Sequence, residues 1–586
     1  MVVPTSSTSA RPEVLVVGAG PSGLMAALSL TRNNMRVRII EKSPTHRIGQ
    51  RGAGITPRSQ ELLKALGVID KIMGEAIPTP MLKMHDLHGG LHSGKIFEIT
   101  PYTESTSSIP YPNIMCLGQN NLERILRNEL EEAYGVTVEL GTELVTLTQH
   151  ADYVSTKILK NGVTENIDYS WVIGADGARG IIRKQLGIPF TGETSNVDNI
   201  CVGDVIIEGL DHQFWHMWGD AATTLISLRP TETPPLFNFI ISGQDVDREG
   251  FISTEGLLQR FLAEKLSAPE LRFGALPWIS TYRPNIRMVD TMGTGRVHLV
   301  GGKLESSTPS DITDRPTIDS AHVHSFTGAQ GMNTGIQDSF SLGWRLALVH
   351  HGLASPSLLA TYGEERLPVI KEMLSQTTNL LNKNLRGQAK PSGWRREGNL
   401  LQLGINCRWS SIVVDQSIED SHLQDVKDVN PIDSYGRTDG DMTVRAGDRA
   451  PDVSGLRLLH AKFPTSRPRT DPHRLTDVLN GTHHVVVLFS SDIERCTATL
   501  ALLASYPEDV IRSAVIVRDG EILPPGSQDP DFIFEDAEEY AYATYDLENQ
   551  CDVIVIRPDG ILGGVLKDDK GLMQYFDRIL NGSQTR

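Results

Sequence analysis

The stretch VLVVGAGPSGL at residues 14–24, followed by VRIIE at residues 37–41, determines the fold expected at the start of this chain. A β-branched apolar run enters the turn Gly18-x-Gly20-x-x-Gly23, and an Ala/Leu-rich helical segment follows. Glycines at these positions permit a tight turn, close approach of the backbone to a pyrophosphate, and tight helix–strand packing. Glu41 ends the second strand, where a carboxylate can bind both hydroxyls of an adenosine ribose. Strand, turn, helix, strand and acid in this order predict a dinucleotide-binding βαβ unit, whereas the glycines alone would be weak evidence.

Length and composition describe a large globular protein. A chain of 586 residues is expected to form two to four domains. Hydrophobic residues make up 39% and charged residues 22% of the chain, which is ordinary for such a protein. The net charge of -17 argues against nucleic acid or an anionic membrane surface as the main partner.

The cysteines indicate a reducing compartment. The five cysteines are scattered, with no CxxC pair and no metal-ligand spacing, so no metal site is expected. Residues 1–13 lack the apolar core of a signal peptide, and no run approaches the roughly 18 apolar residues of a membrane span. We therefore expect a cytoplasmic protein.

The periodicity of the chain divides it into segments. Residues 1–13 are expected to be disordered. Residues 14–189 and 291–400 form a discontinuous nucleotide-binding domain, with an irregular section at 75–115, a helix at 119–134 and a long helix from about 331 past 350. Residues 190–290 contain β-type runs between Pro-rich turns, which predict an inserted antiparallel sheet. Residues 401–448 are typical of a linker, and 449–586 of a separate α/β domain.

Three further segments carry a resemblance to a known family. They are GADGARGIIR at 174–183, RVHLVG at 296–301, and DSAHVHSFTGAQGMNTGIQD at 319–338. Together with the N-terminal motif they closely resemble the FAD-dependent aromatic hydroxylases of the phenol-hydroxylase type, the single-component class A flavoprotein monooxygenases. The resemblance covers nearly the whole chain, because RAGDRAP at 445–451 and IRPDGILG at 556–563 look like that family's thioredoxin-like C-terminal domain. It implies an α/β fold: a Rossmann-like FAD-binding domain, an inserted antiparallel-sheet substrate domain and a thioredoxin-like domain without redox activity.

The resemblance also implies which residues contact the cofactor. The ADP half of FAD would be bound by Gly18, Gly20, Gly23 and Glu41. Helix-start amides near residue 331 would stabilise negative charge on the reduced flavin. The other implied residues are Arg51 on a mobile flavin loop, Gln119 on the cofactor, Asp176 at the FAD pyrophosphate and NADPH, Asp319 on the ribityl chain, and the backbone of Gly331, Met332 and Asn333 on the pyrimidine edge.

One segment departs from the family pattern. In the family the strand that ends in Gly301 runs directly into Asp, a small residue, Ala and His, whereas here residues 302–318 intervene. Excising them restores Val-Gly-Asp-Ser-Ala-His in register. The segment is either a polar surface loop or a retained short intron, and as a loop it would loosen Asp319 and weaken FAD binding.

The implied reaction uses FAD, NAD(P)H and O₂ to hydroxylate a phenolic or polyketide-like aromatic through a flavin C4a-hydroperoxide, and a homodimer is typical of the family. Two alternatives remain: Baeyer–Villiger or decarboxylative oxidation on the same scaffold, and an inactive homologue if the insertion disrupts FAD binding. No catalytic side chain is identified, because the acidic residue that relatives often place near Ala53 is absent. Burial preferences favour structural roles for His212, Trp215, His216, Trp218, Arg229, Phe237 and Tyr282 of the inserted sheet, and a structural role is also expected of His322 and His324.

Overall fold

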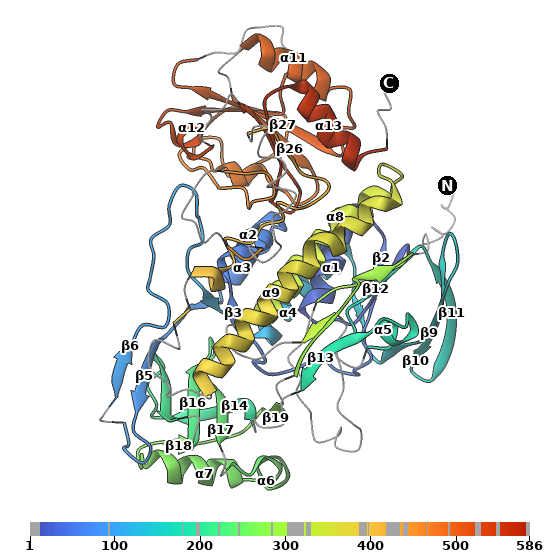
Figure 1. Ribbon diagram of the computed structural model, residues 1–586. Helices are drawn as coiled ribbons and strands as arrows, with labels where there is room; N and C mark the ends of the chain where they lie inside the picture. The colour runs from blue at the N-terminus through green and yellow to red at the C-terminus, as the bar shows by residue number, and fades with distance from the viewer. Residues whose placement is uncertain are drawn as a thin grey trace, which may run out of the picture.

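The computed structural model arranges the chain as three stacked parts (Figure 1), with a parallel-sheet domain between an eight-stranded sheet and a C-terminal domain. It describes residues 12–91, 94–177, 180–194, 200–220, 223–243, 246–282, 285–301, 321–323, 330–385, 395–396, 398–417, 434–436, 444–465, 467–489, 493–521, 529–545 and 551–581.

The parallel-sheet domain contains, within these ranges, a six-stranded sheet of order β21-β22-β12-β1-β2-β8. Its strands run parallel except β21, which pairs antiparallel with β22. β1 is buried along its whole length, as is typical of a parallel strand covered on both faces. The bounds are β1 Val14–Val17, β2 Val37–Ile40, β8 Val138–Glu139, β12 Trp171–Gly174, β21 Gly293–Thr294 and β22 Val297–Leu299.

Smaller sheets and helices complete this domain. Three small sheets are β9–β10–β11 (Thr142–Gln149, Val154–Lys160, Val163–Tyr169), β13–β20–β23 (Phe190–Thr194, Asn285–Val289, His322–Val323) and β3–β7–β4 (Gly54–Ile55, Met115–Cys116, Ile77–Pro78). The helices are α1 Pro21–Arg32, α2 Pro57–Ala65, α3 Ile69–Met73, α4 Gln119–Tyr134, α5 Ile181–Gln185, α8 Gln330–His350 and α9 Ala360–Leu385, with a 3₁₀ turn at Pro356–Leu359.

The helix predicted at 119–134 is confirmed by α4, whose apolar residues form one buried stripe. The long helix α8 ends at His350 rather than continuing past it. Gly352, with φ +73°, lies in the turn that follows, and this left-handed conformation ends the helix.

Helices α1 and α8 pack closely because small residues lie between them. A Cβ added at Gly335 would lie 2.3 Å from the Ser22 Oγ, and one added at Gly343 would lie 2.1 Å from the Ser29 Oγ. The contacts advance in the same direction along both helices, so α1 and α8 run parallel. Their amino ends therefore lie side by side at one end of the domain.

The eight-stranded sheet has the order β18-β14-β17-β16-β15-β5-β6, with β19 paired to β14, among the residues described. Helices α6 (Arg248–Ser253) and α7 (Leu257–Leu266) cover one face (Figure 1). The bounds are β5 Met81–His85, β6 Lys95–Phe97, β14 Ile200–Glu208, β15 Phe214–Gly219, β16 Thr224–Pro230, β17 Leu236–Gly243, β18 Arg272–Phe273 and β19 Trp278–Tyr282.

The prediction of an irregular section at 75–115 is wrong for β4, β5 and β6, and the last two of these strands join the inserted sheet. Strand β5 pairs parallel with β15, and β6 pairs antiparallel with β5, so both extend the inserted sheet. The pairing partner of β5 lies about 130 residues further along the chain, and a local pattern carries no information about so distant a neighbour.

The C-terminal domain contains, as far as it is described, a seven-stranded sheet of order β24-β30-β29-β26-β27-β28-β25. Strand β24 (Val414–Asp415) belongs to the segment predicted as a linker, so this part of 401–448 is packed structure. The thioredoxin-like relationship stays a prediction. The bounds are β25 Arg457–Ala461, β26 His484–Phe489, β27 Ile511–Arg518, β28 Phe532–Asp536, β29 Val553–Ile556, β30 Leu562–Leu566, α11 Ile493–Leu503, α12 Tyr540–Tyr545 and α13 Asp569–Ile579.

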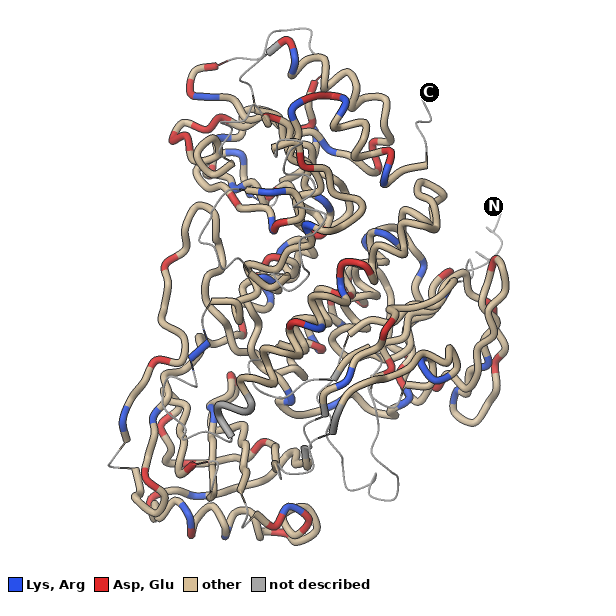
Figure 2. The backbone as a smooth tube through the Cα atoms, viewed as in Figure 1, with Lys and Arg blue, Asp and Glu red and all other residues tan. Residues whose placement is uncertain are grey.

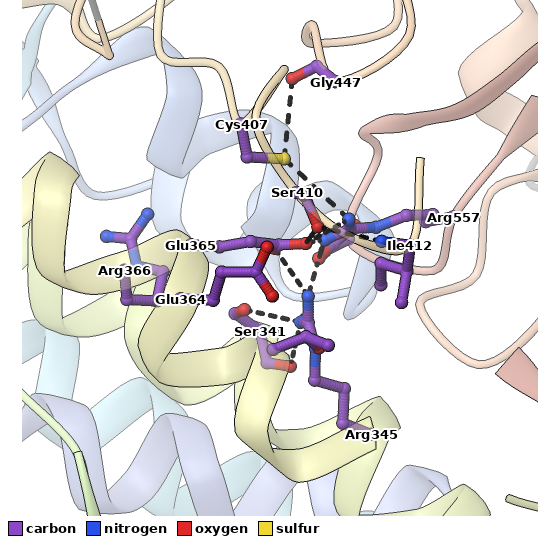
Figure 3. A network of polar contacts seen from close by, with 12 residues as sticks. Ser341, Arg345, Glu364, Glu365, Arg366, Cys407, Ser410, Ile412, Gly447 and Arg557 are labelled. Carbon is purple, nitrogen blue, oxygen red and sulfur yellow. Dashed lines mark hydrogen bonds and ion pairs between the residues drawn. The ribbon is translucent and has the colours of Figure 1, made fainter. Parts of the chain in front are cut away.

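A buried ion network joins the C-terminal domain to α8 and α9 (Figure 3). The Arg557 guanidinium donates to both Glu365 carboxylate oxygens, at 2.8 and 2.9 Å, and to Asp559 at 2.6 Å. Arg345 of α8 reaches Glu365 at 2.5 Å, and the Ser410 hydroxyl donates to Glu365 at 2.6 Å. These charges are almost fully buried, so each depends on the others for compensation.

Charges of both signs are interspersed over all three parts (Figure 2), and no single-signed face dominates this view. In the portion of the chain that the structure covers, no helix combines the length and apolar character needed to cross a membrane.

Candidate cofactor site

Two glycines of the turn at residues 18–23 are required by the packing of the protein itself. Gly18 has φ +103°, and an added Cβ would lie 2.2 Å from the Ala175 carbonyl oxygen. A Cβ at Gly23 would lie 1.9 Å from the Gly18 carbonyl oxygen. These contacts press the turn against the end of β12 and the first turn of α1 against β1.

Gly20 differs from its neighbours. Its φ of -75° and ψ of -179° are accessible to any residue, and it precedes α1 without a side-chain cap. An added Cβ would meet, among described atoms within 4 Å, only Arg47 Nη1, at 3.8 Å. Neither backbone conformation nor packing therefore demands glycine here. The small residue instead keeps the amino end of α1 accessible, where unpaired amides and the helix dipole favour an anion.

Glu41 lies directly after β2 and is buried beside the same turn. Its Oε2 accepts the Ala19 N–H and its Oε1 accepts the Ser43 N–H, both at 3.1 Å. Burial raises the pKa of Glu41, but the Arg47 charge and these backbone donors outweigh burial and hold the pKa below its ordinary value. A carboxylate of lowered pKa at this point suits ribose hydroxyls.

Arg47 was not identified from the sequence. Its Nη2 lies 3.5 Å from Glu41 Oε2, and its Nη1 is the atom nearest to the Cβ position of Gly20. A basic residue six positions after the acid that ends the second strand was the available signal, but a charged loop residue has no periodicity to distinguish it.

Asp176 follows β12 next to Gly18 and has an unused oxygen. Its Oδ2 accepts the Ile182 N–H at 3.2 Å, whereas its Oδ1 is buried without a hydrogen-bond partner in the described structure. Burial raises the pKa of Asp176 to about 6, against the lowering effect of backbone donors such as Ile182. The Oδ1 oxygen faces the start of α5, because a Cβ added at Gly180 would lie 2.4 Å from it.

The amino end of α8 contains Gly331, Met332 and Asn333. The Asn333 Oδ1 accepts the Thr56 N–H at 3.0 Å, and its Nδ2 donates to the Gly54 carbonyl at 2.8 Å. The side chain of Asn333 thus ties α8 to β3. Gly301 adjoins this end, because its added Cβ would lie 2.0 Å from the Ser22 Oγ.

Arg51 and Gln119 lie on neighbouring backbone segments, since the Gln119 N–H donates to the Gly52 carbonyl at 2.8 Å. The Gln119 side chain donates to Glu123 at 2.8 Å. The Arg51 guanidinium stacks on Trp278 of β19, 5.2 Å from the ring centre. Burial, followed by the nearby Arg47 charge, lowers the pKa of Arg51 to about 10. Of the predicted site residues, Asp319 lies outside the described residues, as do residues 302–318.

The residues of the inserted sheet that the sequence analysis considered for substrate contact lie on two different faces of the sheet. His216, Trp218 and Phe237 lie on the face packed on α6 and α7, and the His212 ring lies tilted against Phe237 with the ring centres 4.2 Å apart. Trp215 and Arg229 lie on the opposite face. His322 bonds to Asp338 at 3.3 Å, while His324 and the side chain of Tyr282 are not described.

A polar network on the sheet face opposite α6 and α7 holds the loop that carries Arg51, and no pattern in the sequence predicted this network. The Gln50 N–H donates to Asp204 at 2.9 Å, and the Gln50 carbonyl accepts from Asn238 at 3.3 Å. The Gln50 side chain accepts from Arg229 at 2.9 Å and donates to Glu232 at 2.8 Å. Every polar group of Gln50 is therefore bonded to the inserted sheet or the turn beside it. No cluster of three metal-ligating side chains occurs in the described part of the chain.

Comparison with known proteins agrees with this geometry. Residues 11–377 match the family model described as FAD binding domain. This chain belongs to the FAD-dependent aromatic hydroxylase family. It is 29% identical to a flavin-dependent monooxygenase of Mycobacteroides abscessus over 97% of this chain and 100% of that protein.

Two other relatives align over a smaller share of the chain. The 6-methylpretetramide 4-monooxygenase of Streptomyces rimosus is 31% identical over 62% of this chain and 61% of that protein. The pentachlorophenol 4-monooxygenase of Sphingobium chlorophenolicum is 30% identical over 65% of this chain and 66% of that protein.

Among solved structures, the flavin-dependent monooxygenase PieE in complex with FAD and substrate superposes with a TM-score of 0.76 at 19% identity, covering 98% of this chain and 100% of PieE. This likeness concerns the fold, and it extends through the C-terminal domain.

Proposed function

We propose that this protein is an FAD-dependent monooxygenase that uses NAD(P)H and O₂ to hydroxylate a phenolic or polyketide-like aromatic. Membership of the aromatic hydroxylase family supports the reaction class. The substrate class is supported by two relatives named for a chlorophenol and a pretetramide.

The main structural support for this proposal is the environment of Gly20. Its missing side chain is explained neither by conformation nor by packing. Gly20 lies at the amino end of α1, next to Ala19, whose N–H donates to Glu41, and its added Cβ would lie 3.8 Å from Arg47. These residues fit the pyrophosphate and ribose of FAD. When bound, FAD supplies the electron transfer and the oxygen activation.

The remaining residues of the site would bind and orient the cofactor. The backbone of Gly331, Met332 and Asn333 would offer N–H donors to the flavin, because the parallel packing of α8 on α1 brings their amino ends together. Asp319 would bind the ribityl chain. Arg51 would contact the cofactor from the loop that Gln50 fixes to the inserted sheet, and Gln119 would do so from the start of α4 beside that loop.

The substrate would lie against the sheet face that α6 and α7 leave uncovered by their packing. Met217 and Leu225 on this face are buried among apolar neighbours, which would exclude water from an aromatic ring. Arg229 adds a buried cation, but it is bonded to Gln50 and to the Pro230 carbonyl. We assign no catalytic base.

The C-terminal domain would be a thioredoxin-like domain with a structural or dimer-forming role. The five cysteines are all buried, and burial raises the pKa of Cys407 and Cys551 in this part of the chain. Buried thiols of raised pKa are poor redox nucleophiles. We expect the protein to act in the cytoplasm, with no nucleic acid or membrane partner.

Anaerobic and aerobic assays with a panel of phenols test this function. The purified protein should be yellow, and an aromatic substrate should accelerate NADPH oxidation and gain one oxygen on an intact ring. Ring-inserted oxygen or loss of carbon dioxide would instead support the Baeyer–Villiger or decarboxylative alternative. Colourless protein that FAD does not reconstitute would refute the proposal and favour an inactive homologue.

A further inference from the structure

Gln402 lies in the segment 398–406, which follows α9 in the chain and packs against the amino end of α8. Gln402 is fully buried, and its backbone has φ +64°. This left-handed conformation is strained in a residue other than glycine, and it persists only where the surroundings hold the residue in place. The contacts of Gln402 should therefore explain why the chain keeps this strain.

Every hydrogen-bonding position of the Gln402 side-chain amide is occupied. Its Oε1 accepts from the Thr56 hydroxyl and from the Gln337 Nε2, both at 2.8 Å. Its Nε2 donates to the Gln330 Oε1 and to the Tyr435 hydroxyl, also at 2.8 Å. A side-chain amide has two acceptor and two donor positions, so the protein itself satisfies the whole group.

Two of these bonds reach the two ends of the first turn of α8. Gln330 is the first residue of that helix, and Gln402 binds its side chain directly. Thr56 donates its hydroxyl to Gln402 and its backbone N–H to the Asn333 Oδ1, at 3.0 Å for the second bond. Gln402 therefore holds one end of the turn itself and the other end through a single residue.

The segment 398–406 is itself fixed on both sides. On one side, the Gln330 Nε2 donates to the Leu400 carbonyl at 2.9 Å. On the other, a Cβ added at Gly404 would lie 3.0 Å from the Gly436 Cα, so the two backbones are in direct contact. A side chain that is anchored in this way can set the direction of the helix turn that it contacts.

We propose that Gln402 is a positioning residue for the cofactor site, which fixes the direction of the backbone N–H groups of residues 331–333. This inference rests on the proposed function, in which these groups bind the flavin. N–H groups at a helix start stabilise negative charge, and reduction makes the flavin more negative. Well-directed N–H groups therefore strengthen the binding of reduced FAD more than that of oxidised FAD, so Gln402 raises the reduction potential of the bound cofactor.

The test measures the reduction potential of bound FAD, by reductive titration of the holoenzyme against a reference dye, together with the melting temperature. Gln402→Leu keeps most of the side-chain volume and removes all four bonds. Tyr435→Phe removes a donor to Gln330 and an acceptor for Gln402 but keeps the ring. The matched control is Tyr545→Phe in the C-terminal domain, because Tyr545 is also buried and its hydroxyl donates to the Pro451 carbonyl at 2.8 Å.

We expect Gln402→Leu to weaken the binding of reduced FAD, relative to oxidised FAD, about tenfold, which lowers the potential by about 30 mV for a two-electron couple. Tyr435→Phe should lower the potential by less, and Tyr545→Phe should lower the melting temperature without changing the potential. An unchanged potential in folded Gln402→Leu, or an equal shift in Tyr545→Phe, overturns the proposal.

If Gln402→Leu does not fold, Tyr435→Phe decides, and an unchanged potential in that variant overturns the proposal. The outcome is separable from that of the proposed function. A wild-type protein that does not bind FAD refutes the proposed function and this inference together, whereas a yellow wild type with unchanged variants refutes this inference alone.

Discussion

Replacing Arg557 with methionine should destabilise the protein strongly. The Arg557 guanidinium is 1% exposed and compensates two buried carboxylates, Glu365 and Asp559, with two contacts to each. Methionine keeps most of the volume but leaves two carboxylates facing the single cation of Arg345. Breaking a buried ion pair costs about 3–5 kcal/mol, and we expect a loss of unfolding free energy in that range.

Urea unfolding of full-length protein at pH 7 measures this loss. The matched control is Arg518→Met, because Arg518 belongs to the same domain but pairs with the exposed Glu539, and both side chains are about half exposed or more. A surface pair contributes about 0–1 kcal/mol, so the control should lose no more than that. Similar losses in the two variants would refute the argument from burial.

The pH dependence gives a second check on the same network. Burial raises the pKa of Glu365, but the charges of Arg345 and Arg557 hold it at about 2, below the ordinary value of 4.5. At about 1.36 kcal/mol per pKa unit, Glu365 contributes about 3 kcal/mol above pH 4.5, and this contribution is lost as the pH falls towards 2. Arg557→Met should lose less stability over this interval than the wild type. An unchanged acid dependence would contradict the assignment.

Three further predictions concern the cofactor site. Glu41→Gln should weaken FAD binding about 10- to 100-fold, because a charged acceptor contributes about 1.5–3 kcal/mol, and titration of the apoprotein with FAD measures this; an unchanged affinity would exclude Glu41 as a ligand. Gln50→Ala should free the Arg51 loop from the inserted sheet, lower kcat/KM on the order of 10- to 100-fold and increase the NADPH oxidised per molecule of hydroxylated product. An unchanged ratio of NADPH oxidised to product formed would contradict the role of Gln50. Deleting residues 302–318 should raise the FAD content of purified protein, because a long polar insertion next to Asp319 raises the entropic cost of ordering Asp319. Equal FAD content with and without the segment would show that the segment does not affect the site.

The sequence predicted those features that depend on neighbours along the chain. The helix at 119–134 has the bounds of α4, because Leu122, Ile125, Leu126 and Leu130 repeat at helical spacing and are all buried. The βαβ unit at 14–41 was predictable because its glycines, apolar strands and terminal acid lie within one short segment.

Features that depend on distant partners were not predictable. Strand β5 pairs with β15, and Glu365 meets Arg557 across 192 residues. The composition around Gln402 predicted a linker, yet Gln402 is fully buried and bonds to Thr56 and Gln337. A polar segment has the same composition whether its partners are water or buried side chains, so composition alone does not separate the two cases.

The faces of the inserted sheet show the same limit. Alternation in β15 predicts that Trp215 and His216 point to opposite faces, and they do. This alternation does not predict which of the two faces helices α6 and α7 cover, because that depends on segments elsewhere in the chain.

We propose that Gly20 is small because a cofactor occupies the space at the amino end of α1. Gly20→Val tests this directly, with the flavin absorbance near 450 nm and the melting temperature of the same purified sample as readouts. We expect the Gly20→Val protein to have an unfolding free energy within about 1 kcal/mol of the wild type, because the backbone of Gly20 suits any residue, but to bind little or no FAD. A Gly20→Val protein with full FAD content would contradict it.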